Sequence, residues 1–300
     1  MPAFLSHYAC GIIAFHRMED SYLKECIRKH SGIYSIGLAG PDLFFYSLGE
    51  MFRPGDNIGS TIHTGRCGAF LQALYRQAMQ LQGERRKTAL AYFAGFAGHY
   101  CLDTSCHPLV YQLCGHDLTT RGFGKHYRFE AAMDGEICQR VLGRRIDHSH
   151  QLGLISCSSQ DQAVAAGILA GALSEVFPDC KATVHMRPRR LRVIFKEYRL
   201  ISSLLWDPSG FKEWLVLQIE KMLLGYPYMS ALCINANSYG VTEGERAAFI
   251  KRFARGSRFF IRLLPALSAA AEDEGKAEEL FGQLGNRSYH TGRDASVSNL

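Results

Sequence analysis

The strongest hydrophobic pattern in the chain runs from about Glu84 to Asp103 and is apolar on nearly every side. A helix with one polar face lies on a surface, whereas a helix that is apolar all round lies inside a bundle. We therefore expect a central helix here. Gly95 and Gly98 each cost a helix about 1 kcal/mol relative to Ala, so these small residues indicate a close approach by a neighbouring helix. Pro108 is expected to end the helix.

Helical spacing of apolar residues recurs through the rest of the chain. Ser6 is interpreted as the N-cap of the first helix, and Ser159 with Gln162, like Thr242 with Glu245, matches the capping-box pattern. No stretch alternates with the period of a strand, so the predicted fold is all-α, a single bundle-like domain of many helices. The other predicted helices are residues 6–17, 19–30, 66–82, a helix through 126–142, and about 160–177, 188–206, 210–225, 243–272 and 277–284.

Two polar stretches are expected to lie outside the helices of this predicted domain. Residues 53–65 are polar and rich in Gly, which predicts a loop. Residues 286–300 are rich in Ser, Asn, Gly and charge, which predicts a mobile tail. We expect a domain over residues 1–285, with its chemistry in 1–135 and supporting helices in 155–285.

Composition adds limits on location and partners. The net charge of +6 over 300 residues permits an anionic partner without requiring one. The N-terminus has no signal-peptide pattern, and no apolar run approaches the ~20 residues of a spanning helix. A cytoplasmic protein without a transmembrane segment is therefore expected. The ten cysteines are scattered with no C-x-x-C pair, which favours reduced thiols.

Two histidine-led pairs carry the candidate chemistry. His99 and Asp103 are four residues apart, and so are His126 and Glu130. On a helix this step returns side chains to one face, about 6 Å apart along the axis. A histidine and a carboxylate arranged in this way can bind a cation such as zinc.

Four further residues of the same types precede or lie between these pairs. A single histidine on an apolar helix is more often a hydrogen-bonded core residue, and an acid after a proline often only favours a helix N-terminus. The number and types together favour metal, because buried polar groups without partners cost about 1–3 kcal/mol each and a cation satisfies several. Nitrogen and oxygen ligands suit a catalytic zinc site. The four residues are His7, Asp42, His63 and His107.

In order and type, these residues resemble the zinc-dependent phospholipase C family, whose fold is shared with fungal single-strand-specific nucleases. The resemblance covers roughly residues 1–135, and no motif resembles the family beyond about residue 150. The motifs that carry it are the early His7, Gly40-Pro41-Asp42, His63 before a helix, His99-x-x-x-Asp103, His107 shortly after, and His126-x-x-x-Glu130.

The resemblance implies an all-α hydrolase of phosphate esters with two or three zinc ions. It implies that His63, His99 and Asp103 hold one ion and that Asp103 bridges to a second, which His7 also binds. Asp42 is implied to be the general base, or the group that orients the attacking water. The implied ligands of the third ion are His107, His126 and Glu130.

The N-terminus departs from the family pattern. Secreted members use a mature N-terminal Trp as a ligand beside the early histidine, whereas the two tryptophans here are Trp206 and Trp214. The zinc site of His7 therefore lacks one expected ligand, so the sequence is compatible with either two or three zinc ions.

The substrate and the class of function leave alternatives. A phosphate ester is expected, with phospholipid favoured and nucleic acid less so, because aromatic residues beside Asp42 (Phe44, Phe45, Tyr46 and Phe52) suit a lipid-facing cleft or base stacking. An HD-type metal phosphohydrolase would use His116-Asp117. A non-catalytic, zinc-stabilised interaction protein would use the basic run at residues 187–192, which more often is a solvated helix start.

Overall fold

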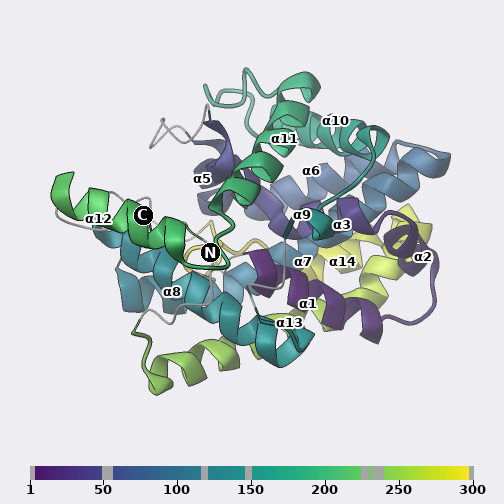
Figure 1. Ribbon diagram of the computed structural model, residues 1–300. Coiled ribbons are helices and arrows are strands. Elements are labelled where there is room, and N and C mark those ends of the chain that lie inside the picture. The colour runs from purple at the N-terminus through teal and green to yellow at the C-terminus, as the bar shows by residue number, and fades with distance from the viewer. Residues whose placement is uncertain are drawn as a thin grey trace.

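The structure, a computed structural model, describes residues 4–48, 57–115, 121–145, 151–223, 230, 233 and 240–296. This part of the chain contains helices and no strand (Figure 1). An isolated bridge joins Arg287 and Asp294. The predicted all-α class is confirmed. The helices are α1 (Phe4–Arg17), α2 (Tyr22–Lys29), α3 (Ser31–Ala39), the 3-10 helix η1 (Gly40–Tyr46), α5 (Ile58–Thr64), α6 (Cys67–Met79), α7 (Gly83–Cys114), α8 (Arg121–Ile137), the π turn η2 (Cys138–Leu142), α9 (Gln151–Leu154), α10 (Ser159–Val176), α11 (Pro188–Leu205), α12 (Phe211–Leu223), α13 (Glu243–Glu272), η5 (Glu274–Lys276) and α14 (Ala277–Leu284).

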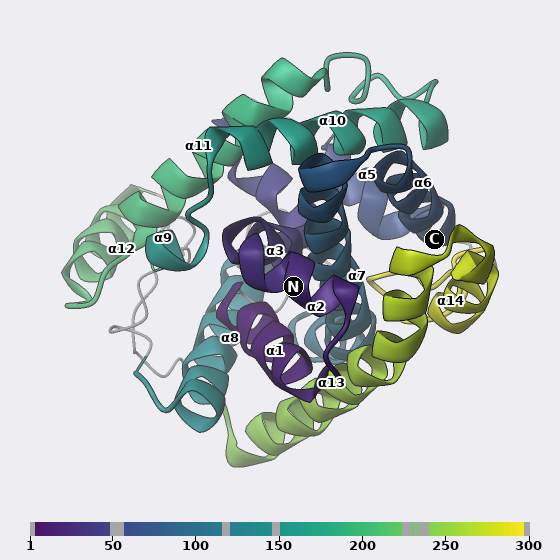
Figure 2. The same ribbon diagram turned by 90° about the vertical axis from the view of Figure 1, so that its right-hand side faces the viewer.

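The central helix is α7, as the apolar pattern predicts. It packs most extensively against α3 and α13, and Figure 2 shows it in the middle of the molecule. A Cβ added at Gly95 would lie 2.2 Å from the carbonyl oxygen of Tyr34 on α3, and one at Gly98 would lie 2.6 Å from the ring of Phe260 on α13. The two glycines therefore allow both helices to approach α7 closely.

The expectation that Pro108 ends this helix is wrong, because α7 continues to Cys114. Pro108 has no N–H to donate to the carbonyl of Thr104, four residues earlier. Gly292, from the C-terminal segment, packs at this point, where an added Cβ would lie 2.5 Å from that carbonyl oxygen. Burial of Leu109 and Val110 beyond the proline keeps the last turns helical in spite of the missing bond.

The start of α1 also differs from the prediction. Ser6 lies inside the helix and is not its N-cap. The backbone N–H groups of Leu5 and Ser6 donate to the two carboxylate oxygens of Asp134 on α8, at 2.8 and 2.9 Å. A carboxylate distant in sequence thus accepts the hydrogen bonds of first-turn N–H groups that an N-cap side chain would usually accept.

Two other helix starts test the capping patterns. The capping box of Thr242 and Glu245 at the start of α13 is confirmed. At the start of α10 the cap is Ser158, whose side chain accepts from the N–H of Asp161, and not Ser159. Adjacent serines offer two possible caps, and the backbone conformation selects one.

The prediction of a loop over residues 53–65 is wrong for residues 58–64, which form α5. Asn57 accepts from the N–H of Gly59 and caps α5, so His63 lies on a short helix. Residues 49–56, which include Phe52, lie outside the described residues. Pro41 and Asp42 occupy the first turn of η1, as expected.

The buried apolar side chains form one contiguous core that extends from Phe4 to Tyr289. All ten cysteines are free thiols and most are buried. No helix in the described ranges is long and apolar enough to cross a membrane.

Residues 286–296 pack back onto α5 and α7. Tyr289 is fully buried, its N–H donates to the carbonyl of His63 at 3.1 Å, and the N–H of Arg287 donates to the hydroxyl of Tyr100 at 2.7 Å. No sequence pattern predicted this packing. Mobility of residues 286–300 stays a prediction, and residues 297–300 lie outside the described part.

Candidate metal centre

The centre is built on one stripe of α7. His99, Asp103 and His107 follow each other at steps of four residues and are all buried. The predicted i,i+4 relation therefore places all three on one face, and the continuation of α7 through Pro108 keeps His107 in line with the other two.

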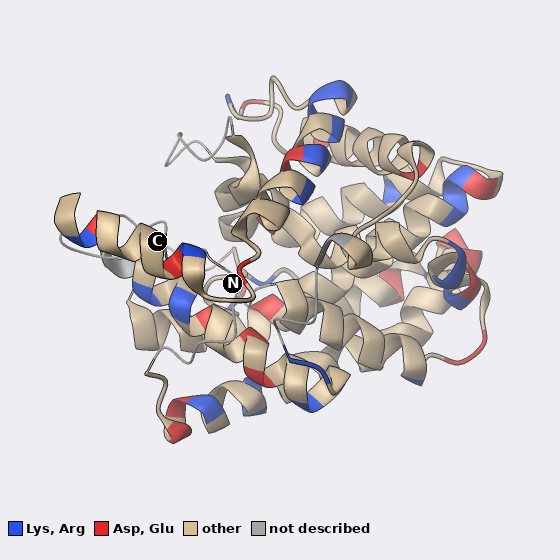
Figure 3. Ribbon diagram, viewed as in Figure 1, with Lys and Arg blue, Asp and Glu red and all other residues tan. Residues whose placement is uncertain are grey.

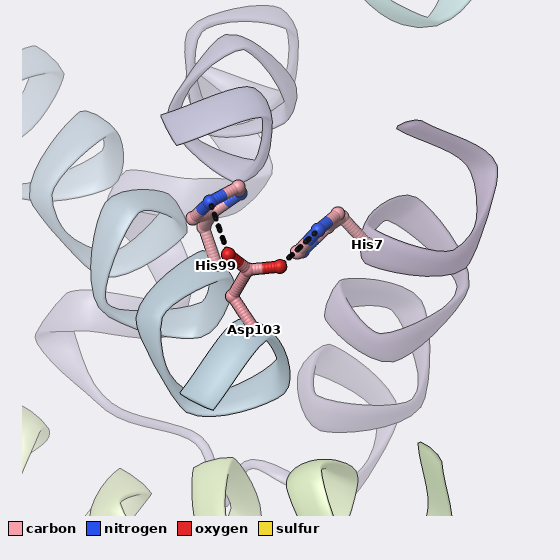
Figure 4. A group of neighbouring side chains, drawn as sticks. All are labelled: His7, His99 and Asp103. Atoms are coloured by element: carbon pink, nitrogen blue, oxygen red, sulfur yellow. Dashed lines mark ion pairs between the residues drawn. The ribbon is translucent and has the colours of Figure 1, made fainter. Parts of the chain in front are cut away.

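Asp103 lies in the middle of this stripe and contacts four histidines. Its Oδ1 is 3.6 Å from Nε2 of His7. Its Oδ2 is 3.0 Å from Nδ1 of His107, 3.6 Å from Nε2 of His63 and 3.9 Å from Nε2 of His99. Figure 4 shows the carboxylate between His7 on α1 and His99 on α7, whose rings stack at 4.1 Å. One carboxylate thus faces imidazoles from three different helices.

Backbone carbonyls orient two of these imidazoles. Nδ1 of His99 lies 3.0 Å from the carbonyl of Leu38, and Nδ1 of His63 lies 2.6 Å from the carbonyl of Gly59. A carbonyl can only accept, so each Nδ1 carries the proton and each Nε2 presents a lone pair to the centre. Gly40, with φ of +54°, makes room for this arrangement, because an added Cβ would lie 2.4 Å from the His99 ring.

The second histidine-led pair lies on α8 and completes the far end of the centre. Nε2 of His126 is 2.9 Å from Oε1 of Glu130, and Nε2 of His107 is 3.8 Å from the same oxygen. All three side chains are buried. His107 thus faces Asp103 with one ring nitrogen and Glu130 with the other.

The eight predicted site residues all come together, but two of the three implied sets are grouped differently, because Asp42 joins His63 and His99, and His99 also joins His7 and Asp103. Asp42 Oδ1 lies 3.2 Å from Nε2 of His63 and 3.6 Å from Nε2 of His99, which places a general-base candidate within ligand range. In each of three sets, one donor atom per residue lies within 4.8 Å of the others: His7, His99 and Asp103; Asp42, His63 and His99; and His107, His126 and Glu130.

Burial sets the protonation of the histidines. It lowers the pKa of His99 well below its usual range and that of His107 to about 4. Burial likewise lowers the pKa of His126 well below its usual range. All three imidazoles are therefore neutral at pH 7, which is the form that binds a metal.

The two central carboxyl groups are shifted in opposite directions. Burial acts to raise the pKa of Asp103, but the adjacent His107, His7 and His99 outweigh it and hold that pKa well below its usual range. Burial raises the pKa of Asp42, and the neighbouring His63 only partly opposes this effect. Asp103 is thus kept ionised, whereas Asp42 holds a proton more readily.

The donors of this centre fit a cation. Among the described residues, several of their buried atoms find no hydrogen-bond partner, and each such atom costs about 1–3 kcal/mol. Nitrogen and oxygen donors in sets of three match the protein ligands of catalytic zinc. The atoms are Nε2 of His7, His63 and His99, both ring nitrogens of His107, Oδ1 of Asp42 and both oxygens of Asp103.

His290 belongs to the surroundings of the centre, although no sequence pattern indicated it. Its ring centroid lies 5.7 Å from that of His63, 5.6 Å from that of His107 and 5.0 Å from that of Tyr111. Burial lowers its pKa to about 2. It follows a polar segment without periodicity, so only the folded chain shows its place.

Two predicted features lie outside the described residues. They are the N-terminus, where the family has the tryptophan that this chain lacks, and the pair His116-Asp117.

Comparison with known proteins agrees with the geometry. A family model described as zinc-dependent phospholipase C matches residues 4–170, more than half of the chain, and its span includes all eight residues of the centre. No curated protein and no solved structure gives a significant match. The residues after 170, with His290 among them, lie outside the matched span. The chain belongs to the zinc-dependent phospholipase C family.

Proposed function

We propose that this protein is a zinc-dependent hydrolase of phosphate esters and acts as a phospholipase C-like phosphodiesterase. The observation that carries the proposal is the shared carboxylate of Asp103, which lies within 3.9 Å of histidines from three helices and is fully buried. Membership of the zinc-dependent phospholipase C family supports it.

The residues of the centre divide into holding and reacting groups. His7, His63, His99, Asp103, His107, His126 and Glu130 would hold two or three zinc ions. Zinc in such a site lowers the pKa of water and neutralises charge on a phosphoryl group.

Asp42 is the group that we assign to the attacking water. Its side chain is 11% exposed, whereas those of His63 and Asp103 are fully buried, so Asp42 lies at the open edge of the centre. Its raised pKa suits a group that accepts a proton from the water. With Oδ1 in ligand range of two histidines, its other oxygen is available to orient the water.

A phospholipid is the substrate that the surface favours. Helix α12 exposes Phe211, Trp214 and Met222, which are 60%, 56% and 78% exposed. This helix is tied to α8 by an ion pair of 3.2 Å between Arg128 and Glu213, and Arg128 lies between the donors of α8 in sequence. Exposed aromatic and aliphatic side chains on one helix are typical of a protein that lies on a membrane surface.

The aromatic residues beside Asp42 contribute less than expected to a lipid-facing cleft. Phe44 is fully buried in the core, and Tyr46 packs edge-on against Tyr198. Phe45 remains near the centre, with its ring centroid 5.6 Å from that of His63.

The charge distribution makes a nucleic acid the weaker candidate. Basic and acidic residues mix along the outer helices such as α11 and α12 (Figure 3). Within the basic run at the start of α11, Arg190 pairs with Glu197 at 3.0 Å. This pairing supports the interpretation of the run as a solvated helix start.

The test is the turnover of Asp42→Asn with bis-(p-nitrophenyl) phosphate, measured beside the zinc content. Asn keeps an oxygen for a metal but is a poor base, so we expect zinc to be retained and kcat to fall about 100-fold or more. Asp161→Asn is the control, because Asp161 also contacts a histidine, His30, at 3.0 Å, but far from the centre. Unchanged turnover in Asp42→Asn would show that Asp42 does not act on the attacking water. A zinc-loaded wild type that hydrolyses no phosphate ester would favour a non-catalytic, zinc-stabilised protein.

A further inference from the structure

A polar pocket of about 330 Å³ lies between α7, α13 and the C-terminal end of α14. Its lining contains three arginines and no acidic residue. Neutral polar side chains from α7 and α14 complete its polar wall. The polar residues that line it are Arg255, Arg262, Arg287, Ser105 and Gln283.

This pocket is distinct from the metal centre. Ser105 follows Asp103 by two residues, so its side chain leaves α7 roughly 200° around the helix from the carboxylate. None of the eight residues of the metal centre lines the pocket. The pocket and the centre therefore use opposite faces of the same helix.

The arginines converge on an aromatic platform. Arg255 and Arg262 are seven residues apart on α13, which places them on one face two turns from each other, with Phe259 between them. The guanidinium of Arg287 lies 4.8 Å from the centroid of the Phe259 ring. The N–H of Arg287 also donates to the hydroxyl of Tyr100 at 2.7 Å. The stacking and the backbone bond hold Arg287 in position before any ligand arrives.

The three charges have no counter-charge in the described part of the chain. Some arginines elsewhere are paired, as Arg246 is with Glu136 and Arg190 with Glu197. Arg255, Arg262 and Arg287 make no ion pair with any described residue. Like charges that line one pocket repel each other, and an anion bound between them would remove this repulsion.

We propose that this pocket binds a phosphate group. The planar fork of a guanidinium matches the oxygens of a phosphate and donates two hydrogen bonds to it. The apolar ring of Phe259 excludes water on one side and so strengthens the attraction. The volume lies at the lower end of the range for small-ligand sites, which leaves room for inorganic phosphate or for the phosphate of a lipid headgroup. The proposal does not depend on hydrolysis at the metal centre.

The test compares the zinc-loaded full chain with two variants. Arg255→Gln combined with Arg262→Gln removes two of the three charges. Arg258→Gln is the matched control, because Arg258 is an exposed arginine of α13 that does not line the pocket. Calorimetric titration with inorganic phosphate forms the first arm. Sedimentation with phosphatidylcholine vesicles, with and without phosphatidic acid, forms the second.

Phosphate binding at the metal centre is common to all three proteins, so their differences report on the pocket. We expect the double variant to bind phosphate about tenfold or more weakly at one site, with its zinc content and Arg258→Gln unchanged. If the double variant loses binding only to the vesicles that contain phosphatidic acid, the ligand is a lipid phosphate. Equal behaviour of all three proteins in both arms, or an equal loss in Arg258→Gln, would overturn the proposal. If the double variant melts below the wild type, Arg255→Lys with Arg262→Lys replaces it. Lysine keeps the charge but lacks the fork, so a smaller but measurable loss of phosphate affinity is expected, again with Arg258→Gln unchanged.

Discussion

At the scale of single residues, the centre depends on Asp103 more than on any other side chain. It is fully buried, and its two oxygens face four imidazoles at 3.0–3.9 Å. The neighbouring histidines hold its pKa well below the usual range in spite of burial. A buried carboxylate in this position is stable only if cations or protonated groups compensate its charge.

Asp103→Asn should therefore remove metal from the set that contains Asp103 and weaken the neighbouring set. We expect a lower zinc content and turnover reduced about 100-fold or more, because the substitution removes the charge that holds the metal next to the reacting phosphate. Zinc analysis and hydrolysis assays on the same preparation measure both effects, with Asp161→Asn as control. Full zinc content together with full turnover would show that Asp103 does not hold metal.

Residue spacing predicted part of this centre and not the rest. The i,i+4 steps place His99, Asp103 and His107 on one face before the structure is known, because they depend only on helix geometry. The ligand-range approach of Asp42 to His63 depends on how η1 and α5 pack, which no local pattern records. The same holds for His290, which reaches the centre from the far end of the chain.

At the scale of helices, α1 begins in an unusual way, because Asp134 of α8 accepts its first-turn N–H groups. Burial raises the pKa of this carboxyl group to about 6. Its value in the unfolded chain is about 4. The folded state therefore binds this proton more tightly, and the stabilisation is complete below about pH 4 and is lost as the pH rises through about 6.

Asp134→Asn tests this linkage, because Asn cannot lose a proton. Between pH 4 and pH 7 the free energy of unfolding of the wild type should fall relative to that of the variant by at most roughly 3 kcal/mol. Urea unfolding of both proteins at each pH measures the difference, in which the titration of the histidines cancels. A difference that stays constant over this range would contradict the raised pKa.

Helix α12 carries the prediction about lipid. Phe211→Ser with Trp214→Ser should reduce hydrolysis of phospholipid in vesicles and leave the turnover of bis-(p-nitrophenyl) phosphate unchanged, because only the first reaction requires adsorption to a surface. Initial rates on the two substrates separate the effects. Val184→Ser removes another exposed apolar side chain, 61% exposed, and is the control. An equal fall on both substrates would mean that α12 supports the fold and does not bind lipid.

Sequence patterns located most helices, including α10 to α14, because apolar periodicity and capping residues are local signals. They failed where a distant contact decides the local structure. Pro108 stays within α7 where buried neighbours and Gly292 pack around it, and α1 begins before Ser6 because Asp134 satisfies its N–H groups.

At the scale of the whole molecule, the two halves of the chain meet at the metal centre. The span matched by the family ends at residue 170, yet Tyr289 donates its N–H to the carbonyl of His63 and His290 lies against two histidines of the centre. The second half therefore closes the centre on one side, in addition to supporting the bundle. This role could not be predicted, since the motifs that identify the family all precede residue 135.

The most direct test of the central claim is the release of diacylglycerol from phosphatidylcholine vesicles by the protein before zinc removal, after zinc removal by a chelator, and after zinc is restored. A zinc-dependent phosphodiesterase predicts measurable release, its loss when zinc is removed, and its recovery in the wild type but not in Asp103→Asn. Release that continues at the same rate in the zinc-free protein, or that recovers fully in Asp103→Asn, would contradict the account.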